Sequence, residues 1–99
     1  MRYLRVEWVH SDPDDPVTLY SEVDEEGREV RKVEIFADGR AGFASQSEKA
    51  GGTELGDQPV PPLAEIAAAG PFRPALITRE EFESVWANRT RPGRKTKAG

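Results

Sequence analysis

The sequence predicts an α+β domain, in which an antiparallel sheet of about four strands is followed by two C-terminal helices packed on one face of the sheet. Three observations lead to this prediction. Residues 3–9 alternate between polar and apolar side chains, an Asp-Gly pair at 38–39 separates two apolar runs, and a helix-capping signature stands at 78–81. A chain of 99 residues has the size of one domain, which we expect to occupy residues 1–88.

The first strand is expected over residues 3–9, because Leu4, Val6 and Trp8 share one face when side chains alternate with a period of two. The stretch 10–16 contains two prolines and three aspartates, which favour turns over regular structure. We therefore expect a loop that leads into the second strand.

The second and third strands are expected on either side of a polar turn. Residues 17–23 alternate again, and residues 29–36 are rich in the β-branched side chains that suit a sheet. The alternation slips by one position at Val30, which predicts a β-bulge. The Asp-Gly pair that follows is typical of a two-residue type I′ turn, so we expect a hairpin with a fourth strand at residues 40–43.

Two helices are expected after residues 45–61, a segment with almost no large apolar side chain that is either mobile or functional. Residues 61–70 combine proline at the first turn with good helix formers and a final glycine. After an extended piece at 73–77, Thr78 and Glu81 form a capping box for the second helix. The apolar stripe of that helix is Phe82, Val85 and Trp86.

Both helices are expected to cover the face of the sheet that carries most of its apolar side chains. The residues expected on this face are Leu4, Val6, Trp8, Leu19, Val23, Val33, Ile35 and Phe43. The other face then stays open and mixes aromatic with charged side chains. The residues expected on the open face are Tyr3, Arg5, Glu7, Tyr20, Glu22, Lys32, Glu34 and Phe36.

This open face is the first candidate for a functional site, because aromatic side chains on a solvated surface supply rigid contact area to a partner protein. The structural alternative is that the charges only pair across strands. A pair such as Arg5 with Glu22 would then contribute roughly a few tenths of a kcal/mol to stability.

No catalytic site is expected on the open face. Acid–base catalysis needs two carboxyl groups in different environments, inside a pocket that excludes water. Glu7, Glu22 and Glu34 would all stay ionised on an open surface beside Arg and Lys side chains. We therefore expect a protein that is not an enzyme and uses no cofactor; a small enzyme built on these carboxylates would need a closed pocket.

No metal site is expected either. His10 with Asp12, Asp14 and Asp15 resembles a cluster of ligands for a hard cation, but Pro16 and the residues after it do not fit the calcium-loop pattern. We interpret these aspartates as residues that cap turns.

Charge and cysteine content restrict the function classes further. The chain has no cysteine, which excludes disulfides and thiol catalysis. Its first eight residues lack the apolar run of a signal peptide or membrane span, so we expect a cytoplasmic protein without membrane association. Residues 1–88 hold 18 acidic and nine basic side chains, and this excess favours a basic partner protein.

Residues 89–99 contain no acidic side chain and no apolar face, and are expected to be a disordered basic tail. The tail either keeps the chain soluble or contacts phosphates, and the second option makes the protein a nucleic-acid-associated accessory protein. Its basic residues are Arg89, Arg91, Arg94, Lys95 and Lys97.

The segments YLRVEWVHSDPDDPVTLYSEVD, GREVRKVEIFADGRAGFAS and ITREEFESVWA resemble an uncharacterised family of small, stand-alone bacterial proteins. The resemblance covers about residues 2–88 and implies a bacterial cytoplasmic domain without an assigned catalytic activity. In size and acidic charge, though not in motif, the chain is also similar to immunity proteins that neutralise nuclease-type toxins. We therefore expect a protein-binding module, an immunity-like or antitoxin-like inhibitor whose acidic body binds a basic partner.

Overall fold

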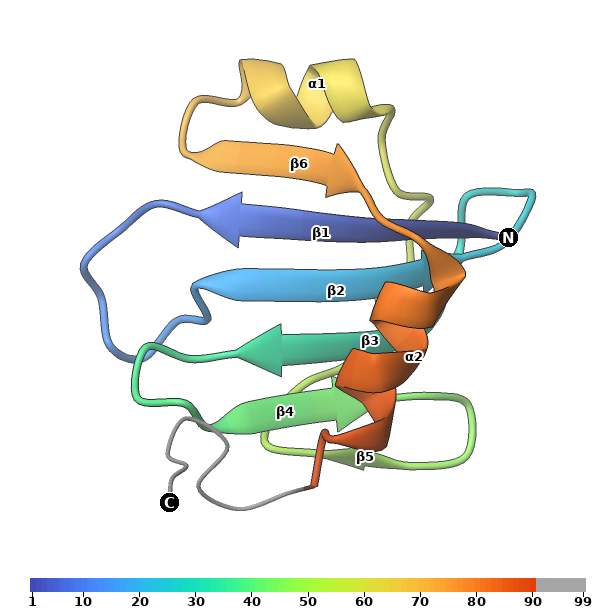
Figure 1. Ribbon diagram of the computed structural model, residues 1–99. Coiled ribbons are helices and arrows are strands. Elements are labelled where there is room, and N and C mark those ends of the chain that lie inside the picture. Colours follow the sequence, from blue (N-terminus) through green and yellow to red (C-terminus); the bar gives the residue numbers. More distant parts are fainter. Residues whose placement is uncertain (91–99) are drawn as a thin grey trace.

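The computed structural model describes residues 1–90, which form one antiparallel sheet of six strands and two helices (Figure 1). The strand order is β5-β4-β3-β2-β1-β6, so the first five strands lie side by side in chain order and the last one returns to pair with the first. The elements are β1 (Arg2–Trp8), β2 (Thr18–Val23), β3 (Glu29–Ile35), β4 (Ala41–Ala44), β5 (Lys49–Ala50), α1 (Leu63–Ala68), β6 (Phe72–Leu76) and α2 (Arg79–Ala87).

The predicted α+β class is confirmed, but the sheet has six strands instead of four. β6 corresponds to the piece that was expected to be extended, and its pairing with β1 makes it an edge strand. Pro74 lies in its middle, where a missing backbone donor is tolerated because the strand is at an edge. β5 has only two residues, without an apolar alternation that would have predicted it.

The predicted bulge at Val30 is confirmed, and it decides which side chains share a face. The strand pairs on either side of it are Glu22 with Arg31 and Val23 with Glu29, which leaves Val30 as the extra residue. Beyond the bulge, Val33 lies opposite Tyr20 instead of Leu19. One inserted residue therefore moves the apolar side chains of β3 to the other face of the sheet.

Each face of the sheet consequently carries part of the core. The α2 face is covered by α2 and includes Tyr3, Val33 and Phe43, whose cross-strand neighbours and ring contacts place them there. The opposite face includes Leu4 and Leu19. The prediction that one face carries all of the apolar side chains is therefore wrong for Val33, Ile35 and Phe43. The bulge and the β3–β4 register place these three residues on the α2 face.

β3 and β4 form the predicted hairpin, although its turn is of another type. The Gly39 amide donates to the Phe36 carbonyl at 2.9 Å, and the Phe36 amide donates to the Arg40 carbonyl at 2.9 Å. Three residues, 37–39, thus connect the strands in place of two. Gly39 has a φ of 92°, the left-handed conformation that closes such a three-residue connection.

α2 begins with the predicted capping box. The Thr78 hydroxyl accepts a hydrogen bond from the Glu81 amide at 3.0 Å, and the Glu81 carboxylate accepts one from the Thr78 amide at 3.3 Å. Phe82 has no exposed surface, and the helix contacts β1 and β2 and runs across the sheet toward β4 (Figure 1). The predicted apolar stripe therefore docks on the sheet.

α1 does not share a face with α2, which corrects the expected packing of both helices together. It lies beyond β6 at the edge of the sheet (Figure 1), and none of its residues is buried. The physical reason is its length, since six residues present only Leu63 and Ile66 as large apolar side chains. Gly70 follows with a φ of 93° and turns the chain back into β6.

Residues 51–60, part of the segment expected to be irregular, cross the opposite face. Thr53 is 1% exposed and donates to the Glu34 carboxylate at 2.7 Å. A Cβ at Gly42 would lie 2.1 Å from the Thr53 hydroxyl oxygen, so only glycine lets the segment approach β4 this closely. This crossing segment closes the opposite face over β3 and β4.

Candidate functional site

The eight residues expected on one open face lie in three different places, so the prediction that they form a single patch is wrong. Lys32 and Glu34 lie on the opposite face, where they hydrogen-bond to the crossing segment. Tyr3 and Glu22 lie on the α2 face, but α2 buries them to 9% and 7% exposure. Phe36 stands at the β3–β4 turn beneath a guanidinium group.

The helix explains this difference. Val33 and Phe43, which the bulge and the register bring to the α2 face, add the apolar surface against which Phe82 and Trp86 pack. α2 therefore docks on the face that was expected to stay open. Only part of that face remains accessible.

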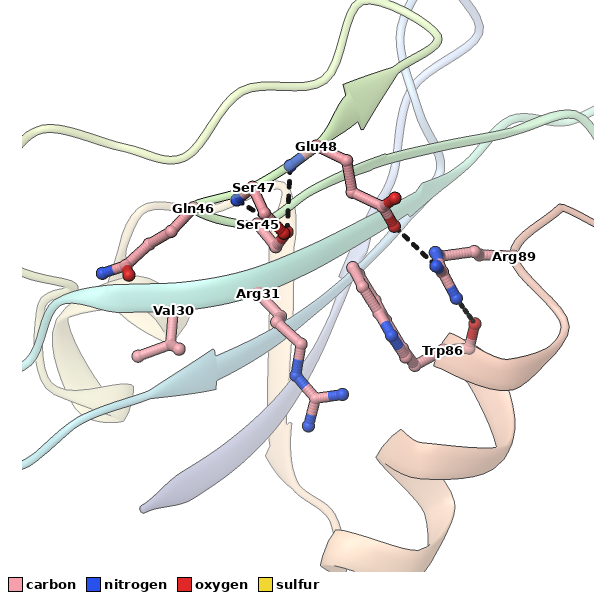
Figure 2. Close-up of a pocket in the computed structure, with 8 residues that line it drawn as sticks. All are labelled: Val30, Arg31, Ser45, Gln46, Ser47, Glu48, Trp86 and Arg89. Atoms are coloured by element: carbon pink, nitrogen blue, oxygen red, sulfur yellow. Dashed lines mark hydrogen bonds and ion pairs between the residues drawn. The ribbon is translucent and has the colours of Figure 1, made fainter.

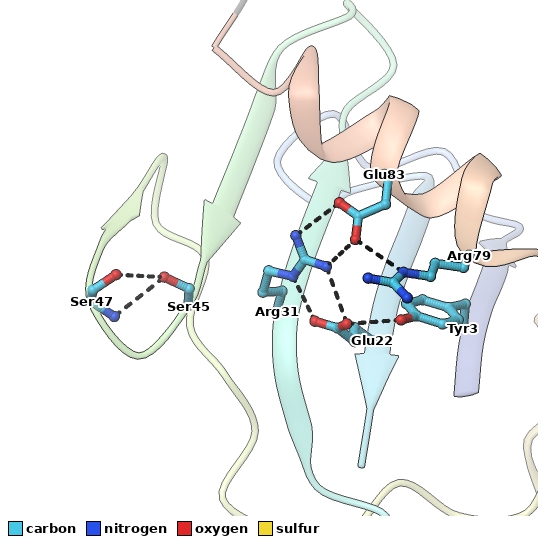
Figure 3. Close-up of polar contacts among 7 residues, drawn as sticks. All are labelled: Tyr3, Glu22, Arg31, Ser45, Ser47, Arg79 and Glu83. Atoms are coloured by element: carbon cyan, nitrogen blue, oxygen red, sulfur yellow. Dashed lines mark hydrogen bonds and ion pairs between the residues drawn. The ribbon is translucent and has the colours of Figure 1, made fainter. Parts of the chain in front are cut away.

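Beneath α2 lies a network of hydrogen bonds between charged groups that joins the helix to three strands (Figure 3). Arg31 donates to the Glu22 carboxylate at 2.5 and 3.1 Å and to the Glu83 carboxylate at 2.7 and 3.2 Å. The Tyr3 hydroxyl donates to Glu22 at 3.0 Å, and Arg79 lies 3.9 Å from Glu83. One guanidinium thus bridges a strand carboxylate and a helix carboxylate.

The network fixes the protonation states of its members. Hydrogen bonds from Arg31 lower the pKa of the Glu22 and Glu83 carboxyls, and the two carboxylates raise the pKa of Arg31. Burial, together with the bond to Glu22, raises the pKa of the Tyr3 phenol. The carboxyls are therefore ionised at neutral pH, and neither is prepared to act as a general acid.

Two arginines lie against aromatic rings: Arg31, which belongs to this network, and Arg89 (Figure 2). The Arg31 guanidinium lies 5.0 Å from the Phe82 ring centre and 5.1 Å from that of Trp86. Arg89 lies 4.0 Å from the Trp86 ring centre and pairs with Glu48 at 2.5 Å. Arg89, which was expected to begin the basic tail, is therefore packed into the fold.

The hollow in Figure 2 lies between these stacked residues and the β4–β5 connection and has a volume of about 420 Å³. Its charged groups are engaged in ion pairs, and Ser45 and Ser47 bond to one another at 3.3 Å. The hollow therefore offers a polar surface, but its charged groups already have partners within the protein.

The loop at residues 10–16 is held by its own polar groups. The Asp12 amide donates to His10 Nδ1 at 3.0 Å, so the proton of the neutral ring lies on Nε2, which donates to the Pro16 carbonyl at 2.8 Å. The Asp12 carboxylate accepts from the Asp14 amide at 2.9 Å. The interpretation as a turn cap is confirmed for Asp12.

The uncovered part of the α2 face, here called the open half-face, lies toward the end of β1, where α2 does not reach (Figure 1). Its cross-strand rows are Ala75-Arg5-Tyr20 and Arg73-Glu7-Thr18-Ile35. Tyr20 and Ile35 are half-buried, whereas Glu7 and Arg73 are exposed. Within residues 1–90, the charged groups of this surface make no ion pair.

Two further results concern the part of the chain that the structure describes. It contains no cluster of three or more His, Asp or Glu side chains placed to hold a metal ion. It also contains no helix with the length and apolar character needed to cross a membrane. The remaining candidates of the basic tail, Arg91, Arg94, Lys95 and Lys97, lie outside the described residues.

Comparison with protein families identifies the domain. A domain of unknown function, DUF6881, matches residues 2–91. The chain belongs to the DUF6881 family. The resemblance to an uncharacterised family is thereby confirmed, and the DUF6881 match includes Arg89, in agreement with its packing against Trp86. No curated protein and no solved structure matches the chain.

Arg31 and Glu83 are the central residues of the DUF6881 network that the sequence analysis missed. Arg31 follows directly on Val30, where the alternation of the strand slips, and Glu83 follows directly on the buried Phe82. Their opposite charges indicate an ion pair only when the docking of α2 is known, because 52 residues separate them in the sequence.

Proposed function

We propose that this DUF6881 domain is a non-enzymatic binding domain that recognises a basic partner protein, in the manner of an immunity-like or antitoxin-like inhibitor. The observation that carries the proposal is the open half-face. Arg5 lies opposite the half-buried Tyr20 there, and Glu7 and Arg73 form part of the next cross-strand row; none of the three forms an ion pair within residues 1–90.

A surface of this kind suits a protein partner. Tyr20 stands in β2, which is paired with strands on both sides, so its backbone is already ordered before binding. Tyrosine is also enriched among residues that dominate binding energies. The unpaired charges around it can set the register of the partner through complementary charges. Three of the eight residues first expected to bind a partner lie on this surface, namely Arg5, Glu7 and Tyr20.

The charge of the body supports a basic partner. Residues 1–88 carry twice as many acidic as basic side chains. Three of the acids, Asp12, Asp14 and Asp15, stand in the loop that follows β1, next to the end of the strand that carries Glu7. An acidic surface speeds the encounter with a basic protein by electrostatic steering.

The charge network supports a non-enzymatic role. The pKa values of the Glu22 and Glu83 carboxyls are both lowered, because Arg31 binds the ionised forms. Groups arranged in this way hold an element in place and do not transfer protons.

The test is an affinity capture from bacterial lysate treated with nuclease, followed by measurement of binding to the purified protein that is recovered. Wild-type chain is compared with Tyr20→Ala and Glu7→Lys, and with Glu25→Lys, the same charge reversal at an exposed position in the turn between β2 and β3, as the matched control. We expect a basic protein that binds the wild type and the control, and binds the two open half-face variants at least tenfold more weakly. Equal binding by all variants would exclude the open half-face.

The same experiment tests the nucleic-acid alternative. A chain ending at residue 90 keeps Arg89 and lacks the other four basic residues of the tail. Recovery that depends on residues 91–99 and disappears with nuclease would favour the accessory role in nucleic-acid binding and contradict the proposal.

A further inference from the structure

A groove of about 330 Å³ lies between α1 and the opposite face of the sheet, away from the open half-face. This volume falls at the lower end of the range for small-molecule sites. The apolar residues that line the groove are Leu4, Val6, Leu19, Val60, Ile66 and Phe72, together with Pro61 and Ala69. They come from β1, β2, β6, α1 and the segment before α1, so the groove is formed by elements that are distant in sequence.

The groove is present because α1 covers the sheet incompletely. The helix contacts β6, and its Ile66 side chain stays half-buried above the groove. Val6, Leu19 and Phe72 are also half-buried, so apolar surface in a concave site remains in contact with water. Covering this surface with an apolar group is favourable by about 25 cal/mol for each Å² removed from water.

The charged groups of the groove determine which charge the head group of a ligand would carry. Its charged lining residues are both acidic, Glu29 and Glu65. Glu29 is already bound by Lys32 at 3.0 Å, by the Gly56 amide at 2.6 Å and by the Ser21 hydroxyl at 3.3 Å. Glu65 is exposed and makes no ion pair among residues 1–90, so it is available to a cation from outside.

We propose that this groove binds a small ligand with an apolar body and a cationic head, of the alkylamine class. The body packs against Leu19, Ile66 and Phe72, and the ammonium group pairs with the carboxylate of Glu65. Charge complementarity favours this ligand over a fatty acid of the same length, because the groove presents no Arg or Lys side chain among its described lining residues. This binding is independent of the proposed protein partner.

The test uses three probes that share an eight-carbon chain and differ in their head group: octylammonium, octanol and octanoate. Each is titrated into the full chain while methyl signals are followed by NMR. We expect the methyls of Val6, Leu19 and Ile66 to shift, with octylammonium binding about fivefold more tightly than octanol, the effect of one exposed ion pair. Octanoate is expected to bind most weakly.

Three variants locate the two parts of the site. Glu65→Gln is expected to lower the affinity for octylammonium to that for octanol and to leave the affinity for octanol unchanged. Ala69→Phe fills the groove and is expected to abolish binding of all three probes, whereas Ala68→Phe, the same change at the neighbouring exposed position outside the groove, is expected to have no effect. Amide spectra confirm that each variant is folded.

The proposal is overturned if octanoate binds as tightly as octylammonium, or if Glu65→Gln leaves the affinity for octylammonium unchanged. It is also overturned if the groove methyls do not shift or if Ala69→Phe binds like the wild type. None of these results bears on the open half-face, whose variants are tested with a protein ligand.

Discussion

Replacing Arg31 with methionine tests whether the charge network holds α2 on the sheet. Arg31 donates two hydrogen bonds to Glu22 and two to Glu83, and it lies against the Phe82 and Trp86 rings. Methionine keeps an apolar stem of similar reach and removes all four hydrogen bonds. The change therefore separates the charge interactions from the packing.

The expected loss follows from the burial of the carboxylate that is left behind. Glu22 is 7% exposed, and without Arg31 it keeps only the bond from the Tyr3 hydroxyl. Removal of one partner from a buried ion pair costs about 3–5 kcal/mol. The Arg31 side chain is 19% exposed, so we take the lower end, about 3 kcal/mol. For a domain of this size, such a loss lowers the Tm by about 12 °C or more.

The assay is urea and thermal unfolding followed by circular dichroism at pH 7, with Arg40→Met as the matched control. Arg40 also pairs with a carboxylate, Asp38, at 2.7 Å, and also lies over an aromatic ring, that of Phe36, at 4.7 Å. Its side chain is 64% exposed, so its replacement should cost less than about 1 kcal/mol. Equal losses in the two variants would refute the argument that burial gives the network its strength.

Three further predictions concern groups near α2 and the crossing segment. The lowered pKa of Glu22 means that, in acid, the unfolded chain binds a proton which the folded chain excludes. Stability should therefore fall as the pH drops below the ordinary carboxyl value of 4.5, and the urea midpoint of Glu22→Gln should change less with pH than that of the wild type. The raised pKa of Tyr3 acts in the alkaline range, since its contribution to stability is fully present below the ordinary value of 10.0 and is lost above it. Tyr3→Phe should therefore reduce the change of the urea midpoint above about pH 10. Gly42→Ala should cost about 1–3 kcal/mol in urea unfolding because its Cβ meets the Thr53 hydroxyl, and adding Thr53→Ala should cost less than the two single changes together.

Local signals predicted much of the fold. The capping box at Thr78 and the bulge at Val30 are each decided by a few neighbouring residues, and both are confirmed. The hairpin is confirmed with a three-residue connection, because the Asp-Gly pair is compatible with more than one turn. β5 was not predicted, since two residues with exposed side chains cannot show the polar–apolar alternation of a strand.

The faces of the sheet could not be predicted in the same way. Placing Val33 on the correct face requires the register between two strands, and a single bulged residue reverses the result. The same error affected the candidate site, because the position of α2 depends on where Val33 and Phe43 lie. Tyr20 and its charged neighbours remained on an accessible surface, whereas Glu22 did not.

The order of the strands in the sheet also has a consequence for the growing polypeptide. β1 is translated first, but it lies between β2 and β6 in the finished sheet. Its second edge therefore stays unpaired until about seventy further residues have left the ribosome, and α2, which covers Tyr3, follows later still. Non-local pairing of this kind slows folding and leaves strand edges accessible to other chains. The first strand to be made is the one that completes its pairing last.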